Sequence, residues 1–149
     1  MTARGLVAEL KAFTLKEPLS LEAFEYGKSV VNITMYKDGV KAATLKCDIL
    51  GKVLKFSKGD TVEGFRRQGL GTKIRALVVW CAKRAGFKEI KQLSTRFKNT
   101  PNTPRPTSAY IMNKLGFRGG IDPNINAEHR FFVLNTNNMS KVNAIVKEL

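Results

Sequence analysis

Two glycines separated by one residue, Gly69 and Gly71, stand directly before a long amphipathic segment. The apolar residues of that segment keep the three-and-four spacing of one helix face: Leu70, Ile74, Leu77, Val78, Cys81 and Ala85. Glycines at the start of a helix let an anion approach backbone N–H groups without a Cβ in the way. The unpaired N–H groups and the helix dipole favour a phosphate there. The segment therefore predicts a phosphate-binding loop, and basic side chains add positive charge to it: Arg66, Arg67 and Lys73.

The spacing of this loop excludes two common kinds of phosphate site. It has no Lys-Ser or Lys-Thr pair after four spacer residues, so it is not a nucleoside-triphosphate loop. It also lacks the third glycine and the later acidic residue of a dinucleotide-binding unit. What remains is Arg-x-x-Gly-x-Gly, formed by Arg66, Gly69 and Gly71, after a predicted strand and before a helix. This pattern resembles the acetyl-CoA pyrophosphate loop of the GNAT N-acetyltransferase superfamily.

A second segment resembles the other signature of the same superfamily. It begins at Ser108 and is predicted to form a short helix that ends in Lys-Leu-Gly-Phe, at Phe117. Each pattern alone is common, whereas the two in this order, with a predicted strand between them, are far more specific. The resemblance implies an α+β fold with one GNAT-like acetyltransferase domain over residues 1–149. It also implies a central mixed, mostly antiparallel sheet with helices on both faces.

The resemblance further implies an acetyl-CoA-dependent N-acetyltransferase, an acyltransferase whose cofactor is held by the loop. The residues expected to bind acetyl-CoA are Arg66, Arg67, Gln68, Gly69, Leu70, Gly71 and Thr72. The pantetheine arm is expected to lie between two splayed parallel strands, at about 52–57 and 88–95, and to pair there like an extra strand.

Glu63 is the candidate general base, because it and Asp60 are the carboxylates close to the loop. A carboxylate beside basic residues tends to have a lowered pKa, so it would act most easily through a water or on an amine already depressed in pKa. The alternative is that Glu63 pairs with Arg66 or Arg67 and does no chemistry.

The acid that protonates the leaving thiolate is where this sequence departs from the family. Many GNAT enzymes carry a tyrosine four residues before the glycine of the Gly-Phe pair, and this chain has Met112 there. Tyr110 lies about 200° away around a helix, whereas Ser108 lies on the same side as Met112. Three alternatives follow: the thiolate leaves unaided, Ser108 or water protonates it, or the domain no longer catalyses a reaction.

Periodicity predicts the remaining elements. Helices are expected at 2–13, 21–26, 70–86, 108–116 and 140–149, and strands at 30–36, 40–49, 52–57, 88–95 and 129–134. The first three of these strands are expected to form an antiparallel meander. Residues 58–65 form either a continuation of the third strand through Val62 or a loose segment. Three prolines predict a loop over 97–107, which either is simply exposed or shapes the acceptor site or contacts a partner.

The net charge is unusually high for a chain of this size. The 26 Lys and Arg residues outnumber the 12 Asp and Glu residues, for a formal net charge of +14. Such a field attracts polyanions, and the three phosphates of an acyl-CoA do not require it. We therefore expect a nucleic acid, or a molecule attached to one, as the acceptor. The basic surface predicted to bind it consists of Arg84, Lys88, Lys91, Arg96, Lys98 and Arg105.

Three alternatives to this hypothesis stay open. The charge can be an adaptation for solubility, with a small amine or a protein as the acceptor. The domain can be a catalytically silent GNAT-fold module that its charge recruits to a polyanionic assembly. It can also be a small basic nucleic-acid-binding protein, although the sequence lacks aromatic residues interleaved with its basic ones.

Length and composition favour one domain, since 149 residues suit a single core and the apolar share of 43% is ordinary for a globular protein. We expect a cytoplasmic protein without a membrane span or secretory signal, because no apolar run is long enough. Cys47 and Cys81 are expected to be buried, reduced thiols, and no metal-ligand spacing occurs. His129, the only histidine, is interpreted as a structural residue rather than a base.

Overall fold

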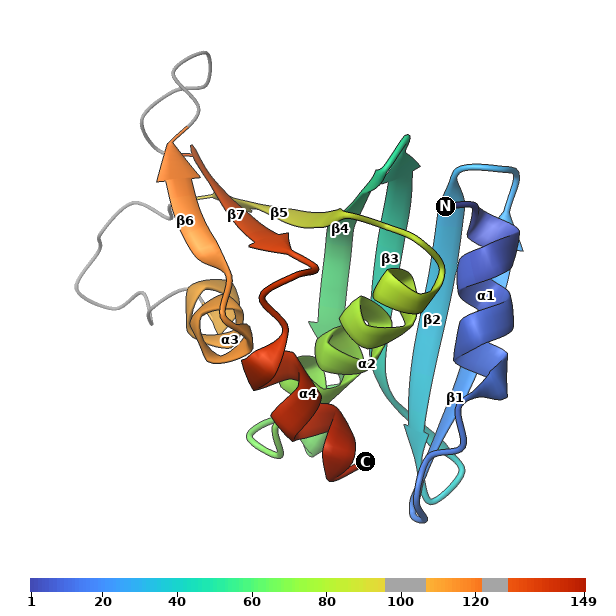
Figure 1. Cartoon of the computed structure of the whole chain (residues 1–149). Helices are drawn as coiled ribbons and strands as arrows, with labels where there is room; N and C mark the ends of the chain where they lie inside the picture. The colour runs from blue at the N-terminus through green and yellow to red at the C-terminus, as the bar shows by residue number, and fades with distance from the viewer. Residues whose placement is uncertain (96–106, 122–128) are drawn as a thin grey trace, which may run out of the picture.

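The computed structural model describes residues 1–95, 107–121 and 129–149, and its strands form one seven-stranded sheet in the order β1-β2-β3-β4-β5-β7-β6 (Figure 1). The strands are β1 (Leu19–Tyr26), β2 (Val30–Lys37), β3 (Val40–Leu50), β4 (Val53–Thr61), β5 (Glu89–Thr95), β6 (Arg118–Ile121) and β7 (His129–Asn135). The helices are α1 (Ala3–Ala12), the short 3-10 helix η1 (Glu63–Phe65), α2 (Leu70–Arg84), α3 (Thr107–Leu115) and α4 (Ser140–Lys147). All neighbouring strands are antiparallel except β4 and β5, which confirms the α+β class and the mixed, mostly antiparallel sheet.

Alternating side chains explain the pairing of β2 and β3. Val31, Ile33 and Met35 are buried, while the residues between them are partly exposed. The chain turns between the two strands at Asp38 and Gly39, whose φ angles of 52° and 75° are those of a tight hairpin turn. This hairpin matches the sequence prediction.

The short helix predicted at 21–26 is wrong, because this segment belongs to β1. Every residue of β1 pairs with β2, from Leu19 opposite Lys37 to Tyr26 opposite Val30. Only Ala23 is buried in this edge strand. The apolar side chains on its inner face alternate with polar ones, so a period of two was present in a segment too short and too polar to show it clearly.

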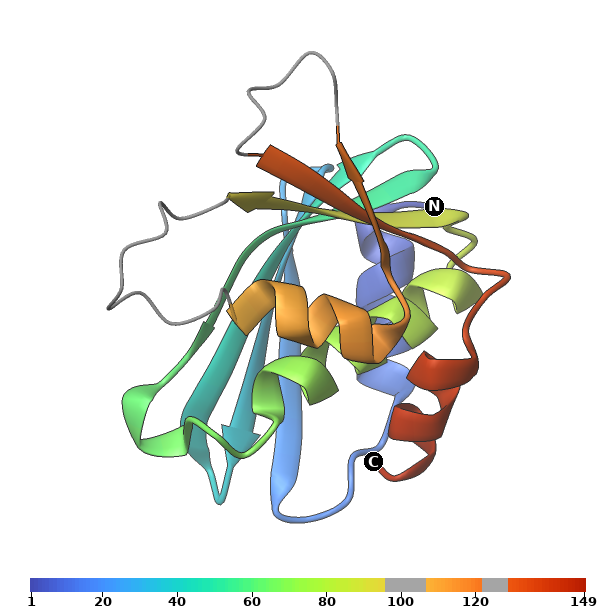
Figure 2. The ribbon, with the colours of Figure 1, turned by 90° about the vertical axis from the view of Figure 1, so that its left-hand side faces the viewer.

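The helices contact one another on one face of the sheet, as Figure 2 shows, so their expected placement on both faces is wrong. Helix α1 covers β1 and β2 and packs against α2, where the rings of Phe13 and Trp80 lie 5.5 Å apart at an angle of 75°. Helix α2 in turn covers β3 and β4 and contacts α3 and α4. The physical reason is the three-residue turn between β1 and β2, which leaves no room for a helix after β1, and no other described helix lies on the second face. We call this second face the open face of the sheet.

Strands β4 and β5 pair only over part of their length. The last pair joins Phe56 to Gln92, and beyond it β4 pairs with β3 alone and β5 with β7 alone. The parting follows a bulge in β4, because Lys46 and Cys47 of β3 face Lys58 and Phe56, which leaves Ser57 as an extra residue. Strand β4 nevertheless continues to Thr61, so of the two alternatives for 58–65 the structure has the longer strand.

No helix among the described residues is long and apolar enough to cross a membrane.

Candidate functional site

The predicted phosphate loop leads into α2, and its two glycines are required for different reasons. Gly69 caps the helix with a φ of 73°, a left-handed conformation that only glycine adopts at little cost. Gly71 has ordinary backbone angles, but a Cβ on it would lie 3.2 Å from Ile111 Cδ1 and 3.3 Å from Arg75 Nη1. The glycine spacing therefore reflects one conformational and one packing requirement.

The start of α2 is open to an anion. No side chain of the described residues caps its first N–H groups, and its first turn has no acidic residue. Leu70 is buried and anchors the helix, whereas Arg66 to Gly69 are exposed. A bare helix N-terminus with exposed loop residues is the arrangement that favours a bound phosphate.

The side chains around the loop hold its geometry. Arg66 Nε donates to the carbonyl of Thr61 at 3.3 Å and so ties the loop to the end of β4. Lys37 Nζ donates to Gln68 Oε1 at 2.6 Å, which brings a further cation to the loop. No pattern in the sequence indicates Lys37, because it lies on the β2–β3 hairpin, far from the loop in sequence.

The parting of β4 and β5 begins beside this loop, as the resemblance implied for the strands at 52–57 and 88–95. Beyond the last pair, residues 57–61 of β4 have no strand partner on the side that faces β5. Apart from the carbonyl of Thr61, which accepts from Arg66, this edge can pair with an extended ligand, in the way a strand edge accepts an added strand.

Arg75 and Gln92 lie where the two strands part, and both are buried, with 7% and 8% of their surface exposed. Arg75 Nε donates to Gln92 Oε1 at 3.4 Å, and Arg75 Nη1 donates to the carbonyl of Gly71 at 3.1 Å. Burial lowers the pKa of Arg75, although a guanidinium stays protonated in proteins. Neither residue could be recognised from the sequence, because an arginine on a helix is ordinarily exposed.

Glu63, the candidate base, is the first residue of η1 and is exposed. Within the described part of the chain it forms no ion pair with Arg66 or Arg67. Its side chain therefore lies beside the loop and does not form the ion pair that was the alternative to a catalytic role.

None of the described side chains is a candidate for the acid that protonates the leaving thiolate. Ser108 is the second residue of α3, and neither its side chain nor that of Tyr110 lies within the described part of the structure. Met112 is completely buried in the core, so the position where many family members carry a tyrosine does not face solvent here. His129 begins β7, with its backbone opposite Thr95.

Of the basic residues predicted to form one surface, the described Arg84 and Lys91 lie on opposite sides of the sheet. Arg84 lies on α2, where its Nε is 3.0 Å from Glu9 and its guanidinium stacks over Trp80 at 5.0 Å. Lys91 lies on the open face, and its Nζ is 3.3 Å from Glu89. The sheet separates the two cations, because α2 and β5 belong to different layers. Lys88 is exposed just before β5. The other three fall outside the described residues or their described side chains: Arg96, Lys98 and Arg105.

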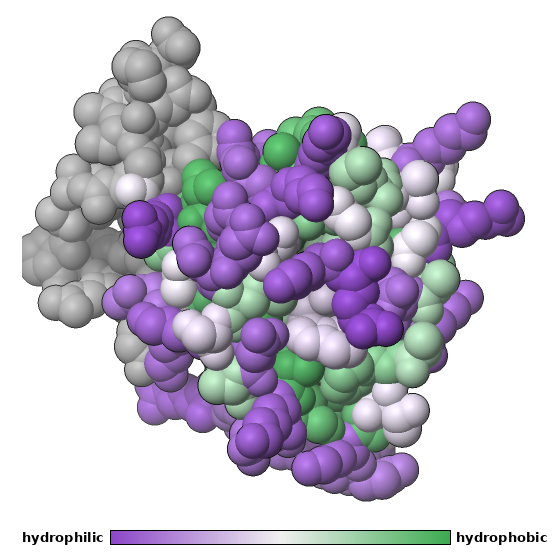
Figure 3. Space-filling view, in the orientation of Figure 1, coloured by the Kyte–Doolittle hydropathy of each residue, from purple (hydrophilic) through white to green (hydrophobic). Residues whose placement is uncertain are grey.

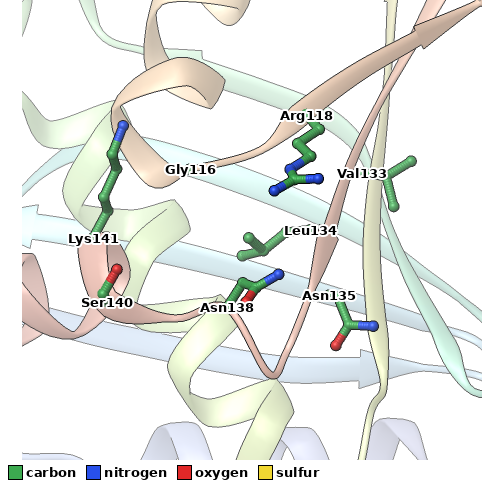
Figure 4. Close-up of a pocket in the computed structure, with 8 residues that line it drawn as sticks. All are labelled: Gly116, Arg118, Val133, Leu134, Asn135, Asn138, Ser140 and Lys141. Carbon is green, nitrogen blue, oxygen red and sulfur yellow. The ribbon is translucent and has the colours of Figure 1, made fainter.

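A shallow groove of about 480 Å³ lies elsewhere, between β6, β7 and the start of α4 (Figure 4). Its lining includes Arg118, Asn135 and Lys141 but no residue of the phosphate loop. Asn135 of β7 is opposite Glu89 of β5, and Glu89 is opposite Val53 of β4. The groove therefore lies near the ends of β4 and β5 that are paired with each other. The groove is therefore separate from the place where the strands part.

Neither a protein-family model nor a curated protein sequence matches this chain. Solved structures do match its fold. An acetyltransferase from Bacillus subtilis in complex with CoA aligns with a TM-score of 0.62 and 12% identity, over 78% of this chain and 98% of that chain. A GNAT family acetyltransferase from Elizabethkingia anophelis with acetyl-CoA bound has a TM-score of 0.62 and 11% identity, over 80% and 99%.

The ribosomal-protein-S18-alanine N-acetyltransferase from Escherichia coli aligns with a TM-score of 0.60 and 11% identity, over 77% of this chain and 90% of that one. At identities this low, the alignments show that the backbones follow the same course, and they say nothing about the chemistry of particular side chains. The agreement extends over most of both chains in each case. The parted strands, the glycine loop and the helix behind it thus belong to a chain that has the fold of the GNAT N-acetyltransferase superfamily.

Proposed function

We propose that this protein is an acetyl-CoA-dependent N-acetyltransferase, an acyltransferase that transfers an acyl group from a thioester to an amine. The observation that carries the proposal is the combination of an uncapped, glycine-bounded start of α2 with β4 and β5 parting beside it. The fold neighbours that contain CoA or acetyl-CoA support it.

The chain offers a binding residue for each part of such a cofactor. The backbone N–H groups of Gln68 to Thr72 would take the pyrophosphate, and the exposed Arg66 and Arg67 supply charge beside them. The free edge of β4 would pair with the amides of the pantetheine arm. When bound, the cofactor supplies an activated acyl group as a thioester.

Glu63 is the proposed base. Its carboxylate is exposed beside the loop and would accept a proton from the attacking amine, directly or through a water. Ser108 remains the proposed acid on the sequence pattern alone, with water or an unassisted thiolate as the alternatives. A catalytically silent module is the alternative function, and the loss of the family's tyrosine at Met112 favours it.

Binding of CoA tests the proposal, and the chain provides a matched control. Gly69 and Gly51 both have positive φ angles, 73° and 61°, and a Cβ on either would meet no atom within 4 Å. Replacing either glycine with valine therefore imposes the same kind of backbone strain in open space. We expect Gly69→Val to weaken CoA binding at least about tenfold in calorimetry, and Gly51→Val to leave it unchanged. Wild-type protein that does not bind CoA would refute the proposed function.

We also propose that the acceptor is a nucleic acid or a molecule bound to one, with the open face of the sheet as its surface. Lys46 and Lys58 are exposed and directly opposite each other. Lys55 lies between Lys91 on β5 and Asp48 on β3, and Lys91 is also paired with Glu89. Like charges in cross-strand pairs destabilise a sheet, and a polyanion over them would reverse that effect. The strand row of Lys46 also contains Phe24, which is 44% exposed.

A further inference from the structure

Arg75 is a buried cation that has no acidic partner among the described residues. Only 7% of its surface is exposed, and no ion pair of the described residues includes it. Its hydrogen bonds go to neutral oxygens, because Nε donates to Gln92 Oε1 at 3.4 Å and Nη1 donates to the carbonyl of Gly71 at 3.1 Å. A charge that has left water is ordinarily paired with an opposite charge, since its burial is costly. The described residues therefore leave the positive charge of Arg75 uncompensated.

The guanidinium lies against the first turn of α2. Side chains of a helix incline toward its N-terminus, and this direction brings Nη1 of Arg75 back to the carbonyl of Gly71. Two glycines leave the space that it occupies. A Cβ on Gly71 would lie 3.3 Å from Nη1, and a Cβ on Gly59 of β4 would overlap Nη2. The cation is thus built in between the phosphate loop and the neighbouring strand.

The first turn of α2 is also where the proposed function places the pyrophosphate of CoA. The N–H groups of the turn carry only partial charges, and the charges of Arg66 and Arg67 are exposed to water and salt. A buried cation acts through a medium of lower dielectric constant, so at the same distance it attracts an anion more strongly than an exposed cation does. An anion on the loop would in turn supply the negative charge that Arg75 lacks.

We infer that Arg75 is a positioning residue for the pyrophosphate of the cofactor. Its charge draws the anion to the start of α2, and its bond to the carbonyl of Gly71 holds the turn that receives the anion. Gln92 fixes the other end of the guanidinium through Nε. The inference rests on the proposed function and adds a buried charge to the exposed residues of the loop.

Calorimetry with CoA and thermal unfolding of the free protein test this inference together. Arg75→Met keeps an extended side chain and removes the charge. We expect it to weaken CoA binding about tenfold or more. We also expect the free variant to unfold at the same or a higher temperature than the wild type, because a buried unpaired charge is removed. An arginine with a merely structural role would lower both the affinity and the unfolding temperature.

Arg75→Lys restores the charge without the planar guanidinium. At about pH 6, where a buried lysine keeps its proton more readily than at higher pH, this variant should recover most of the affinity for CoA. Lys83→Met is the matched control, because it removes one exposed charge about two turns further along α2. We expect its affinity for CoA to equal that of the wild type.

Salt provides a further measurement. The loss of affinity in Arg75→Met should be as large at high salt as at low salt, because a buried charge is little screened. The loss in Arg67→Met should shrink at high salt, because Arg67 is exposed.

An affinity of Arg75→Met for CoA within about twofold of the wild type would overturn the inference and leave the proposed function intact. Binding of CoA by Arg75→Lys as weak as that by Arg75→Met would also overturn it, because the shape of the side chain rather than its charge would then matter. A joint loss of affinity and of thermal stability in Arg75→Met would assign Arg75 to the fold alone. Failure of the wild type to bind CoA would overturn both the inference and the proposed function.

Discussion

The thiols of Cys47 and Cys81 are both buried, as predicted, and burial has a consequence for stability. Removal from water raises the pKa of the Cys81 thiol to about 12 and raises that of Cys47 further still. Glu9 raises the pKa of Cys81 further, whereas the Arg75 guanidinium lowers that of Cys47 and offsets only part of the effect of burial. An unfolded cysteine has a pKa of about 8.5. The unfolded chain therefore loses these protons at a lower pH than the folded chain does.

This difference predicts a loss of stability in mild alkali. The contribution of the thiols is fully present below about pH 8.5 and declines above it, because only the unfolded state releases protons there. Between pH 8 and 9.5 we expect the free energy of unfolding to fall by about 2 kcal/mol for the two thiols together. Urea unfolding across this range measures it. A variant with Cys47→Ala and Cys81→Ala should show a nearly flat profile, and an equally steep one would contradict the assignment.

Residues that act locally could be predicted from the sequence, whereas those that act through the fold could not. Gly69 and Gly71 lie at the start of a periodic helix, so their place in a loop followed from spacing alone. Arg75 is buried because it packs against Gly59 and donates to Gln92, which lie on two different strands. No local pattern marks a contact of that kind.

Helix α3 carries the main departure from the family pattern, and its packing shows why a tyrosine does not fit. Met112 is completely buried and belongs to the core, as do Ile111 and Leu115 of the same helix. Replacing it with the larger tyrosine would overpack a filled site and bury a hydroxyl. We expect Met112→Tyr to lower the free energy of unfolding by about 1–3 kcal/mol and to leave any transferase activity without gain.

Met112→Leu is the control for this change, because it conserves volume and should cost less than about 1.5 kcal/mol. Urea denaturation compares the two variants. A stable Met112→Tyr protein with higher activity would show instead that the position reaches the reacting atoms.

At the scale of elements, long periodic segments were predictable and short edge elements were not. The extents of α1 and α2 and the hairpin of β2 and β3 follow from apolar spacing. Strand β1 carries a single buried residue, Ala23, so its pairing with β2 decides its conformation rather than any pattern of its own. The side of the sheet that α1 covers is likewise set by its contacts with α2.

The net charge of +14 is a property of the whole molecule. Hydrophilic residues also cover much of the helix side (Figure 3). The open face is distinguished by its cross-strand lysine pairs rather than by charge alone. Two variants with the same loss of four charges separate these possibilities. One carries alanine at open-face residues, Lys46, Lys55, Lys58 and Lys91. The other carries alanine at exposed helix residues, Arg4, Lys11, Lys83 and Lys147.

We expect the wild type to bind RNA and duplex DNA with an affinity that falls steeply with salt, because phosphate contacts release counterions. In the open-face variant, the slope of log affinity against log salt concentration should decrease by the contribution of about four phosphate contacts. The helix variant should keep most of the wild-type slope. Fluorescence anisotropy at two salt concentrations measures both. Equal effects of the two variants would make the charge a general property of the protein surface, and no binding at low salt would favour a small amine or a protein as the acceptor.

The pairing of β4 with β5 ends where the bulge at Ser57 begins. On either side of it the strand keeps the same inward-facing alternation, with Leu54 and Phe56 before it and Gly59 and Thr61 after it. Removing Ser57 would therefore leave every inner side chain on its own face and straighten the strand against β5. The ladder could then lengthen toward Leu93, and the place for a ligand would close. We therefore expect deletion of Ser57 to extend the pairing of β4 with β5 and to close the gap between them.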